Sequence, residues 1–367
     1  MTLTRGFGAF DSLAGLRLDP WLTGSLLALM GFGLLVLYSA TDQDGGMVVR
    51  QAVRLGFGVV VLLVLAQLPG RLMQQWAPWL FLLAVLLLVA VWLFGVGRGA
   101  QRWLDLGVIR FQPAEAMKLA LPLMLATVLA RRPLPPGWLD LGLCLALIGV
   151  PVGLIVVQPD LGTAVLVGAS GLCILFLAGL RWRLIFAMAA AVAAALPLVW
   201  FNLHAYQQSR VLTFLNPERD PLGQGWNIIQ SKIAVGSGGL GGKGWLEGSQ
   251  SHLEFLPEPH TDFIFSVFAE EFGFVGVLAL LALYALIVLR GLYLAANCRD
   301  TFGRLLGGSL VLMFFFYLAV NVGMVSGLLP VVGVPLPLIS YGGTSAVTLL
   351  AGFGIVMGLY SRRRFMG

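Results

Sequence analysis

Asp262 lies where a polar stretch of the chain meets an apolar one, in the segment PEPHTDFIFSVFAEEFGFVG that begins at Pro257. A carboxylate at such a boundary is partly withdrawn from water, which raises its pKa and makes it a better proton acceptor near neutral pH. The same side chain could instead cap a helix, because aspartate accepts hydrogen bonds from the free N–H groups at a helix start. The sequence leaves both roles open.

Three small residues follow Asp262 at helical spacing and would share its face of a helix: Ser266, Ala269 and Gly273. Small side chains beneath a carboxylate leave room, so the pattern predicts a groove there for a lipid chain or a sugar. Glu271 points away from this face, and we expect it to pair with a buried Lys or Arg.

Other ionisable residues also fall at the ends of apolar runs. Glu115 and Lys118 are one helical turn apart and can pair, and Asp160 opens the apolar run of the QPDLGTA segment. Arg102 and Arg110 lie in the polar stretch just before Glu115. Charged groups in membrane segments are costly and usually functional. However, Glu115 with Lys118 could equally be a structural ion pair, and Asp160 a helix N-cap.

The run GSGGLGGKG, from Gly236 to Gly244, contains the spacing G-x-G-x-x-G that often binds nucleotides. No strand precedes the run, so the dinucleotide-binding motif does not fit. No Ser or Thr follows Lys243, so the P-loop motif does not fit either. Backbone N–H groups of such a loop, with Lys243 or the nearby Lys232, could still hold a diphosphate. His260 is a further candidate for supporting a site near Asp262, but the histidines are too scattered for metal ligation.

Composition predicts the fold class. Hydrophobic residues make up 59% of the 367 and charged residues 11%, whereas a soluble domain carries about 25% charged residues. Apolar runs of roughly 18 to 25 residues recur, each long enough to cross a bilayer as a helix. We therefore expect an all-α polytopic membrane protein, one domain over residues 1–367. The net charge of +6 needs no nucleic-acid partner, because orienting loops are rich in Lys and Arg.

About ten membrane helices are predicted, at 21–40, 48–68, 77–97, 113–130, 139–157, 160–180, 183–203, 263–290, 303–328 and 341–360. Both ends of the chain then lie on one side, where the loops hold more than half of the 23 Lys and Arg residues. Positive loops stay in the cytoplasm, so we expect both termini there. The loop 98–112, with three arginines, is an exception outside.

Residues 204–261 form a large polar loop between the seventh and eighth predicted helices, on the outer side. A loop longer than about 15 residues is usually functional or disordered. Within it, Trp226, Ile229 and Ile233 alternate with Gln230 and Lys232 at helical spacing, which predicts a short amphipathic helix. That helix could lie in the membrane interface or pack as a lid on the bundle.

The outer position of the acid limits the chemistry. Nucleotide-activated substrates are absent outside the cell, so an activated sugar must arrive linked to a lipid. A base with cations nearby suits transfer from a polyprenyl diphosphate, which leaves as an anion. A lipid flippase is one alternative, although it would need polar groups across the whole bilayer. A non-catalytic scaffold is the other, although it gives a half-buried acid no purpose.

Several segments together resemble the shape, elongation, division and sporulation (SEDS) family: AQRWLDLGVIRFQPAEAMKLALP, QPDLGTA, GWNIIQSKIAVGSGGLGGKGW, QSHLEFLPEPHTDFIFSVFAEEFGFVG and GMVSGLLPVVGVPLPLISYGGTSAV. The likeness extends from about Asp19 to Arg364. It implies a ten-helix peptidoglycan glycosyltransferase that polymerises lipid II on the outer face of the bacterial cytoplasmic (inner) membrane. The essential aspartate of the family falls on Asp262.

The resemblance also implies partners and roles. Asp262 would remove a proton from the 4-hydroxyl of the acceptor N-acetylglucosamine, and undecaprenyl diphosphate would leave the growing glycan. Lys118, Arg110, and Lys232 or Lys243 would hold diphosphate groups. Family members act with a class B penicillin-binding protein, here within the elongation machinery, and are associated with a divalent cation such as Mg²⁺ or Mn²⁺.

Overall fold

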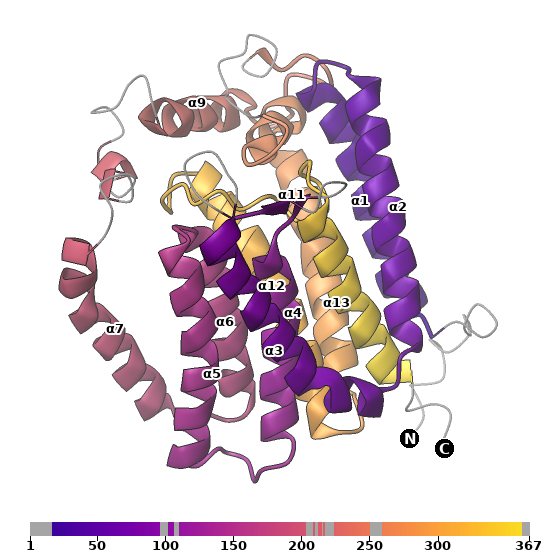
Figure 1. Cartoon of the computed structure of the whole chain (residues 1–367). Coiled ribbons are helices and arrows are strands. Elements are labelled where there is room, and N and C mark those ends of the chain that lie inside the picture. The colour runs from indigo at the N-terminus through magenta and orange to yellow at the C-terminus, as the bar shows by residue number, and fades with distance from the viewer. Residues whose placement is uncertain are drawn as a thin grey trace, which may run out of the picture.

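The computed structural model describes residues 17–95, 102–105, 110–202, 208–209, 212–214, 216, 224–249 and 259–361. The side chain of Arg110 lies outside the described residues, as do His204 and His252. Ten long helices run lengthwise through the molecule (Figure 1): α1 (Pro20–Ala40), α2 (Gly45–Gln67), α3 (Gly70–Phe94), α4 (Pro113–Leu129), α5 (Trp138–Val157), α6 (Leu161–Leu177), α7 (Trp182–Asn202), α11 (Ile264–Ala296), α12 (Thr301–Val325) and α13 (Thr344–Ser361).

These helices confirm the all-α fold class and coincide with the ten predicted spans. In the described part, seven helices are long and apolar enough to cross a membrane, and α6 is a shorter apolar one. The largest difference is in α3, which begins at Gly70 instead of residue 77 and continues through Pro78. The chain turns back at Pro69 immediately after α2, so the polar residues expected in a loop form the first turns of α3.

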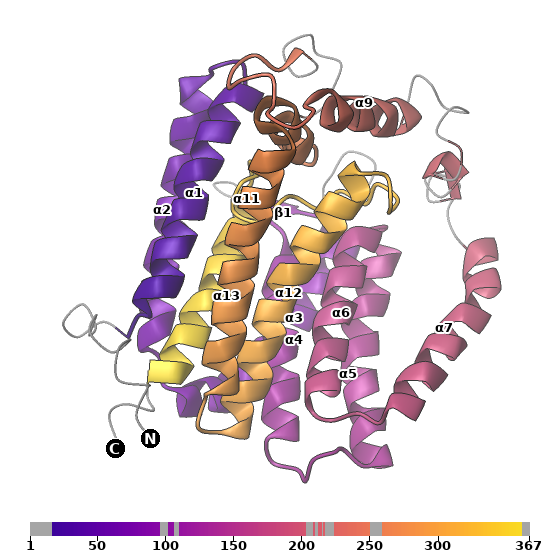
Figure 2. The same cartoon turned by 180° about the vertical axis from the view of Figure 1, so that it is seen from behind.

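Helix α12 occupies the middle of the bundle and packs against α4, α6, α11 and α13. Helix α2 packs mainly against α13, where Gly354 and Gly358 face the backbone of Leu62 and Ala66 so closely that a Cβ at either glycine would overlap it. Small residues four apart let two membrane helices approach in this way. Helix α7 stands apart from the bundle in both side views (Figure 1, Figure 2).

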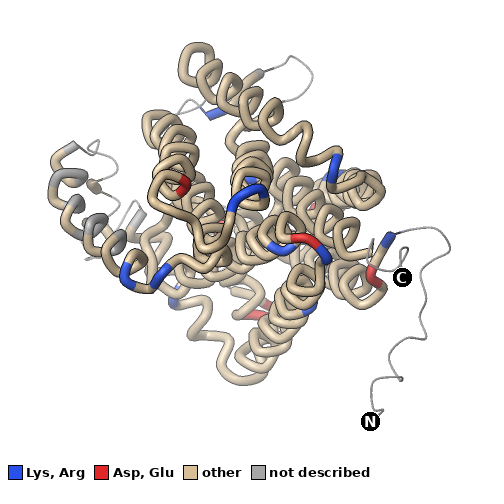
Figure 3. Tube along the Cα trace, turned by 90° about the horizontal axis from the view of Figure 1, so that it is seen from below, with Lys and Arg blue, Asp and Glu red and all other residues tan. Residues whose placement is uncertain are grey.

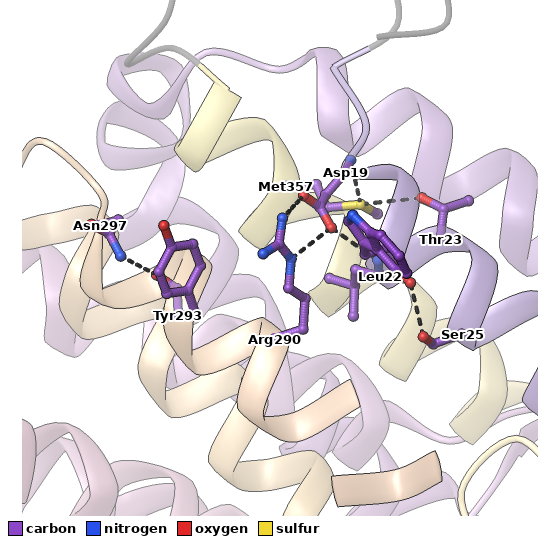
Figure 4. Close-up of polar contacts among 9 residues, drawn as sticks. Asp19, Leu22, Thr23, Ser25, Arg290, Tyr293, Asn297 and Met357 are labelled. Carbon is purple, nitrogen blue, oxygen red and sulfur yellow. Dashed lines mark hydrogen bonds and ion pairs between the residues drawn. The ribbon is translucent and has the colours of Figure 1, made fainter. Parts of the chain in front are cut away.

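Helix α1 begins and helix α13 ends at the same end of the bundle, which we call the terminal end (Figure 1). Seen from this end, Lys and Arg are more prominent than Asp and Glu (Figure 3). Asp19 caps α1 there and receives two hydrogen bonds from the Arg290 guanidinium of α11, at 3.0 and 2.6 Å. The Thr23 hydroxyl and the Asp19 N–H both contact the Met357 sulfur of α13, so three helices meet at Asp19 (Figure 4).

Helix α9 (Gln224–Ser237) crosses the opposite end, which we call the loop end (Figure 1). It confirms the predicted short helix, but its buried face is not the predicted one. Ile228, Ser231 and Ala234 are buried against α11 and α12, and the Ser231 hydroxyl donates to the Val325 carbonyl at 2.9 Å. Ile233, expected on the apolar face, is 45% exposed. The helix therefore packs on the bundle through Ile228, Ser231 and Ala234 and leaves Ile233 outside.

Helix α11 is broken at Gly273, which has φ +64° and ψ −167°. The glycine-rich run after α9 fills this break with its backbone. Lys243 and Gly244 donate their N–H groups to the Glu270 and Glu271 carbonyls at 3.0 Å. In the other direction, Phe274 and Val275 donate to the Gly239 and Leu240 carbonyls at 2.9 and 3.1 Å. We call residues 238–244 the splint, because backbone groups freed by a break must find partners within the protein.

The splint needs glycine for close approach. A Cβ at Gly238 would overlap the Ala269 carbonyl, and one at Gly242 would overlap that of Glu271. Its neighbouring side chains add polar links, because Lys243 Nζ lies 2.5 Å from Glu270 Oε1 and Ser249 donates to the same oxygen at 3.0 Å. The glycines therefore let the splint form backbone hydrogen bonds within the protein, a role that nucleotide-binding motifs do not predict.

Replacing Gly273 with alanine should lower the free energy of unfolding by about 2–4 kcal/mol, because only glycine adopts this conformation without strain. A Cβ at Gly273 would also overlap the Gly242 nitrogen of the splint. The thermal unfolding midpoint of the detergent-purified protein measures the effect. Gly236→Ala is the control, since no atom lies within 4 Å of its Cβ position. Equal midpoints for the two variants would contradict the splint.

Candidate functional site

Asp262 precedes the first residue of α11, and the backbone around it is fixed by a polar network. The Tyr341 N–H donates to the His260 carbonyl at 2.9 Å, and the Ser340 hydroxyl to the Thr261 carbonyl at 2.6 Å. The Asn321 amide donates to the Asp262 carbonyl at 2.9 Å. Three successive carbonyls are therefore held by α12 and the loop before α13, so the main chain that carries the acid is rigid.

The Asp262 side chain is partly exposed and lies over the loop between α12 and α13. One carboxylate oxygen would be 3.5 Å from a Cβ at Gly333, a residue with φ +74°. The neighbouring Val332 carbonyl lies so close to Gly162 that a Cβ at this glycine would overlap the carbonyl oxygen. The start of α6 thus supports the loop that faces Asp262.

The groove expected beneath Asp262 is not open. Ser266 and Ala269 are 0% and 2% exposed, and the splint residue Gly238 fills the space at Ala269. The prediction was wrong because it assumed a helix face directed at lipid or substrate, whereas this part of α11 is inside the protein. The Ser39 hydroxyl of α1 donates to the Glu271 carboxylate, and the lysine of the splint pairs with Glu270.

Asp160 has the capping role and an additional one. It precedes α6 and accepts from the Thr163 N–H at 3.3 Å. Its carboxylate also accepts from the Gln112 amide at 3.0 Å and lies 3.7 Å from Arg102, which donates to the Pro159 carbonyl at 2.7 Å. The site candidates Asp160 and Arg102 therefore hold the segment before α4 against the start of α6.

That segment includes a ribbon of two short antiparallel strands, β1 (Leu104–Asp105) and β2 (Arg110–Phe111), which the sequence analysis does not predict. Strands of two residues have no detectable periodicity. The ribbon matters because Phe111 of β2 and Trp103, which precedes β1, line the cavity described below.

Glu115 and Lys118 form the predicted ion pair on α4, at 2.7 Å, and both are almost fully buried. Lys118 also donates to the Tyr317 hydroxyl of α12, which joins the two helices in the core. The second carboxylate oxygen of Glu115 has no hydrogen-bond partner among the described residues. Glu115 also borders the cavity described below.

A cavity of about 1000 Å³ opens at the loop end between α2, α4 and α13. Its lining is mostly apolar and aromatic, with two charged residues, Arg54 and Glu115. The Arg54 guanidinium lies 4.5 Å above the Tyr341 ring, and the His260 ring meets Tyr341 edge to face at a centroid distance of 6.0 Å. Tyr341 therefore connects the cavity to the segment that carries Asp262.

Arg54 was missed by the sequence analysis, although a signal was present. It is an arginine inside a predicted membrane span, and such residues are functional candidates by default. The other lysine candidates lie elsewhere: Lys243 pairs with Glu270 in the splint, and Lys232 packs over Gly327 at the end of α12. The structure thus brings Glu115, Lys118 and His260 near one cavity and places Lys232 and Lys243 on the α9 side.

Among the described residues, no three His, Cys, Asp or Glu side chains gather closely enough to hold a metal ion.

Comparison with known proteins shows the family. The FtsW/RodA/SpoVE family profile, described as cell cycle protein, matches residues 20–364. The chain belongs to the SEDS family. It is 55% identical over 352 residues to the peptidoglycan glycosyltransferase MrdB of Escherichia coli K12, and the match covers 95% of each chain. It is 33% identical to the peptidoglycan glycosyltransferase RodA of Treponema pallidum, and that match covers 98% of this chain and 99% of RodA.

Solved structures agree with this membership. A chain from a study of polymerisation and crosslinking by a peptidoglycan synthase complex matches with a TM-score of 0.82 and 40% identity, covering 95% and 99% of the two chains. RodA of Thermus thermophilus matches with a TM-score of 0.72 and 33% sequence identity, and the match covers 97% of this chain and 99% of that RodA chain. This SEDS protein is accordingly a multi-pass membrane protein, and the network around Asp262 belongs to a fold seen in solved relatives.

Asn321→Leu should lower the rate of glycan polymerisation by roughly 10- to 100-fold, because misplacing a reacting group by about 1 Å costs that much. The substitution keeps the side-chain size but removes the donors to the Asp262 and Val334 carbonyls, at 2.9 and 2.7 Å. Initial rates with labelled lipid II would show a loss in kcat larger than any change in KM.

Asn297→Leu is the matched control, since its amide donates to the Tyr293 carbonyl near the terminal end (Figure 4). It should retain the rate of the unaltered protein. Equal rates for Asn321→Leu and the unaltered protein would show that the network does not position the acid.

Proposed function

We propose that this chain, a peptidoglycan glycosyltransferase, polymerises lipid II at the outer face of the bacterial cytoplasmic membrane during cell elongation, with Asp262 as general base. One observation carries the assignment. A partly exposed carboxylate stands on a backbone fixed by three hydrogen bonds, and Tyr341 links that backbone to a cavity at the same end of the membrane bundle.

Charge supports the orientation. The loops and helix ends at the terminal end carry Arg71, Arg131, Arg132, Arg181, Arg183, Arg299 and Arg304, all exposed. Membrane proteins keep such loops in the cytoplasm, so both termini lie there. The loop end, with Asp262 and the cavity, then faces outward, where lipid II is available.

The reaction follows from these positions. Asp262 accepts the proton of the acceptor 4-hydroxyl while that oxygen bonds to the anomeric carbon of the lipid-linked growing glycan. The bond from that carbon to undecaprenyl diphosphate breaks, and the configuration inverts. Lys118 is 2% exposed and paired with Glu115, so its part is to hold Glu115 at the wall of the cavity and to link it to Tyr317 of α12.

The structural likeness to a chain of a peptidoglycan synthase complex supports a partner that crosslinks the glycan. A class B penicillin-binding protein of the elongation machinery supplies transpeptidation. Three apolar residues at the loop end are exposed and could contact lipid or a partner: Ile233, Leu240 and Trp245.

The distribution of buried charge favours a transferase over a flippase. Among the described residues, Glu115, Lys118, Asp160, Glu270 and Glu271 are buried towards the loop end, and Asp19 at the terminal end. A flippase needs polar groups along the whole path of its headgroup. A non-catalytic scaffold would not need an acid presented beside a cavity.

Asp262→Asn should reduce polymerisation by roughly 10²- to 10⁴-fold, the usual effect of losing a general base. Purified protein with labelled lipid II in detergent, together with the partner transpeptidase, provides the assay, and glycan chains are separated by gel. Glycan polymer also distinguishes a transferase from a flippase or scaffold. Asp140→Asn is the control, since Asp140 pairs with exposed Arg132 at the terminal end. Normal chain growth by Asp262→Asn would refute the assignment.

A further inference from the structure

Arg54 lines the cavity and has no acidic partner, unlike most described cations of the loop end; Lys232, on the α9 side, is the other described exception. Lys118 pairs with Glu115, Lys243 with Glu270 and Arg102 with Asp160. Arg50, one turn from Arg54 on α2, pairs with Asp44 at 3.6 Å. Among the described residues no carboxylate forms an ion pair with Arg54, whose contact is the Tyr341 ring.

The depth of Arg54 makes this unusual. At about 1.5 Å per residue it lies about 14 Å along α2 from Gly45, well inside a span. An arginine at such a depth is costly unless an anion or water accompanies it. Its guanidinium lines the cavity, where Gly343 leaves space against its side chain. The cavity therefore presents a cation without a protein counter-charge.

A second hollow lies further along the same helices. It has a volume of about 470 Å³ and is lined by apolar residues of α2, α3, α4 and α13, among them Leu65, Trp76, Ala116, Leu119 and Ile355. We call it the apolar groove. It begins at Ala116, next to Glu115 of the cavity, and its lining on α3, from Leu87 to Leu72, extends about 22 Å towards the terminal end.

The groove is open to the bilayer on the side of α3. Trp76, Leu80 and Leu83 line it and are 56%, 43% and 53% exposed. Helices α2 and α3 pack far less against each other than α2 packs against α13. A lipid chain can thus enter between α2 and α3 without crossing polar protein.

We propose that Arg54 binds the diphosphate of the lipid-linked substrate and that the apolar groove holds the adjoining part of its prenyl chain. The inference rests on the proposed function and assigns the diphosphate to a residue not among those predicted from the sequence. A guanidinium forms paired, charge-assisted hydrogen bonds with phosphate oxygens. The juxtaposition of an unpaired cation with an apolar channel matches an anionic head on a long hydrocarbon tail.

The position also suits the reaction. Arg54 stacks on Tyr341, whose backbone N–H holds the His260 carbonyl two residues from Asp262. A diphosphate at Arg54 would lie on the cavity side of Tyr341, and the base on the far side. Trp103 and Phe111 of the cavity offer apolar walls for the ring of a sugar attached to that diphosphate.

The test measures binding without turnover. Undecaprenyl diphosphate displaces a fluorescent polyprenyl diphosphate from the full-length protein in nanodiscs. Arg54→Gln should weaken its binding roughly 10- to 100-fold, the effect of losing a charge-assisted hydrogen-bond pair, and Arg54→Lys should weaken it less. Arg50→Gln is the matched control on the same helix and should stay within about twofold of the unaltered protein.

Competitors separate the head from the tail. Inorganic pyrophosphate and phosphatidylglycerol should compete weakly, because the first lacks the chain and the second lacks the diphosphate. Ala116→Phe narrows the groove and should weaken the binding of undecaprenyl diphosphate but not that of geranyl diphosphate, whose chain is short. Should phosphatidylglycerol compete equally well, the site would be a general anionic-lipid site and the proposal would be overturned.

Two outcomes distinguish this proposal from the assignment of the base. Asp262→Asn should bind undecaprenyl diphosphate normally while failing to polymerise. If Arg54→Gln bound like the unaltered protein, this inference would fall and the general base would stand. If Asp262→Asn polymerised normally while Arg54→Gln lost binding, the base assignment would fall and the diphosphate site would stand.

Discussion

The structure depends on the requirement that every backbone polar group within a membrane bundle finds a partner in the protein. This requirement is hardest to meet around α11, which starts just after Asp262 and breaks at Gly273. At the break, four backbone hydrogen bonds come from the splint. Before the first turn, Tyr341, Ser340 and Asn321 satisfy three successive carbonyls. The half-helix that carries the acid is therefore fixed at both ends.

This rigidity matters for chemistry because preorganised groups need not be ordered during the reaction. The fixed segment meets the cavity through Tyr341, which contacts Arg54 on one side and His260 on the other. The side-chain amide of Gln51 on α2 supports the same loop. Its NH2 group donates to the Ser340 and Gly342 carbonyls, and its oxygen accepts a hydrogen bond from the Gly342 N–H. Helix α2 thus contributes both the wall of the cavity and the support of the loop.

Much of the fold could be predicted from the sequence because long apolar runs have few alternatives in a bilayer. Glu115 with Lys118 could be predicted because their contact is local to one helix turn. Other features could not. The splint joins residues 238–244 to 270–275, and the Arg54–Tyr341–His260 contacts join three distant segments. The predicted groove beneath Asp262 failed for the same reason, since what covers a helix face is decided by distant residues such as Gly238.

The central claim is that Asp262 accepts the proton of the attacking hydroxyl, and the pH dependence of kcat/KM for lipid II polymerisation tests it most directly. With the unaltered protein, we expect kcat/KM to fall tenfold per pH unit on the acid side, because protonating the carboxylate removes the base. The residual activity of Asp262→Asn should lack this acid limb. An acid limb of the same slope and position in the asparagine variant would mean that another group takes the proton.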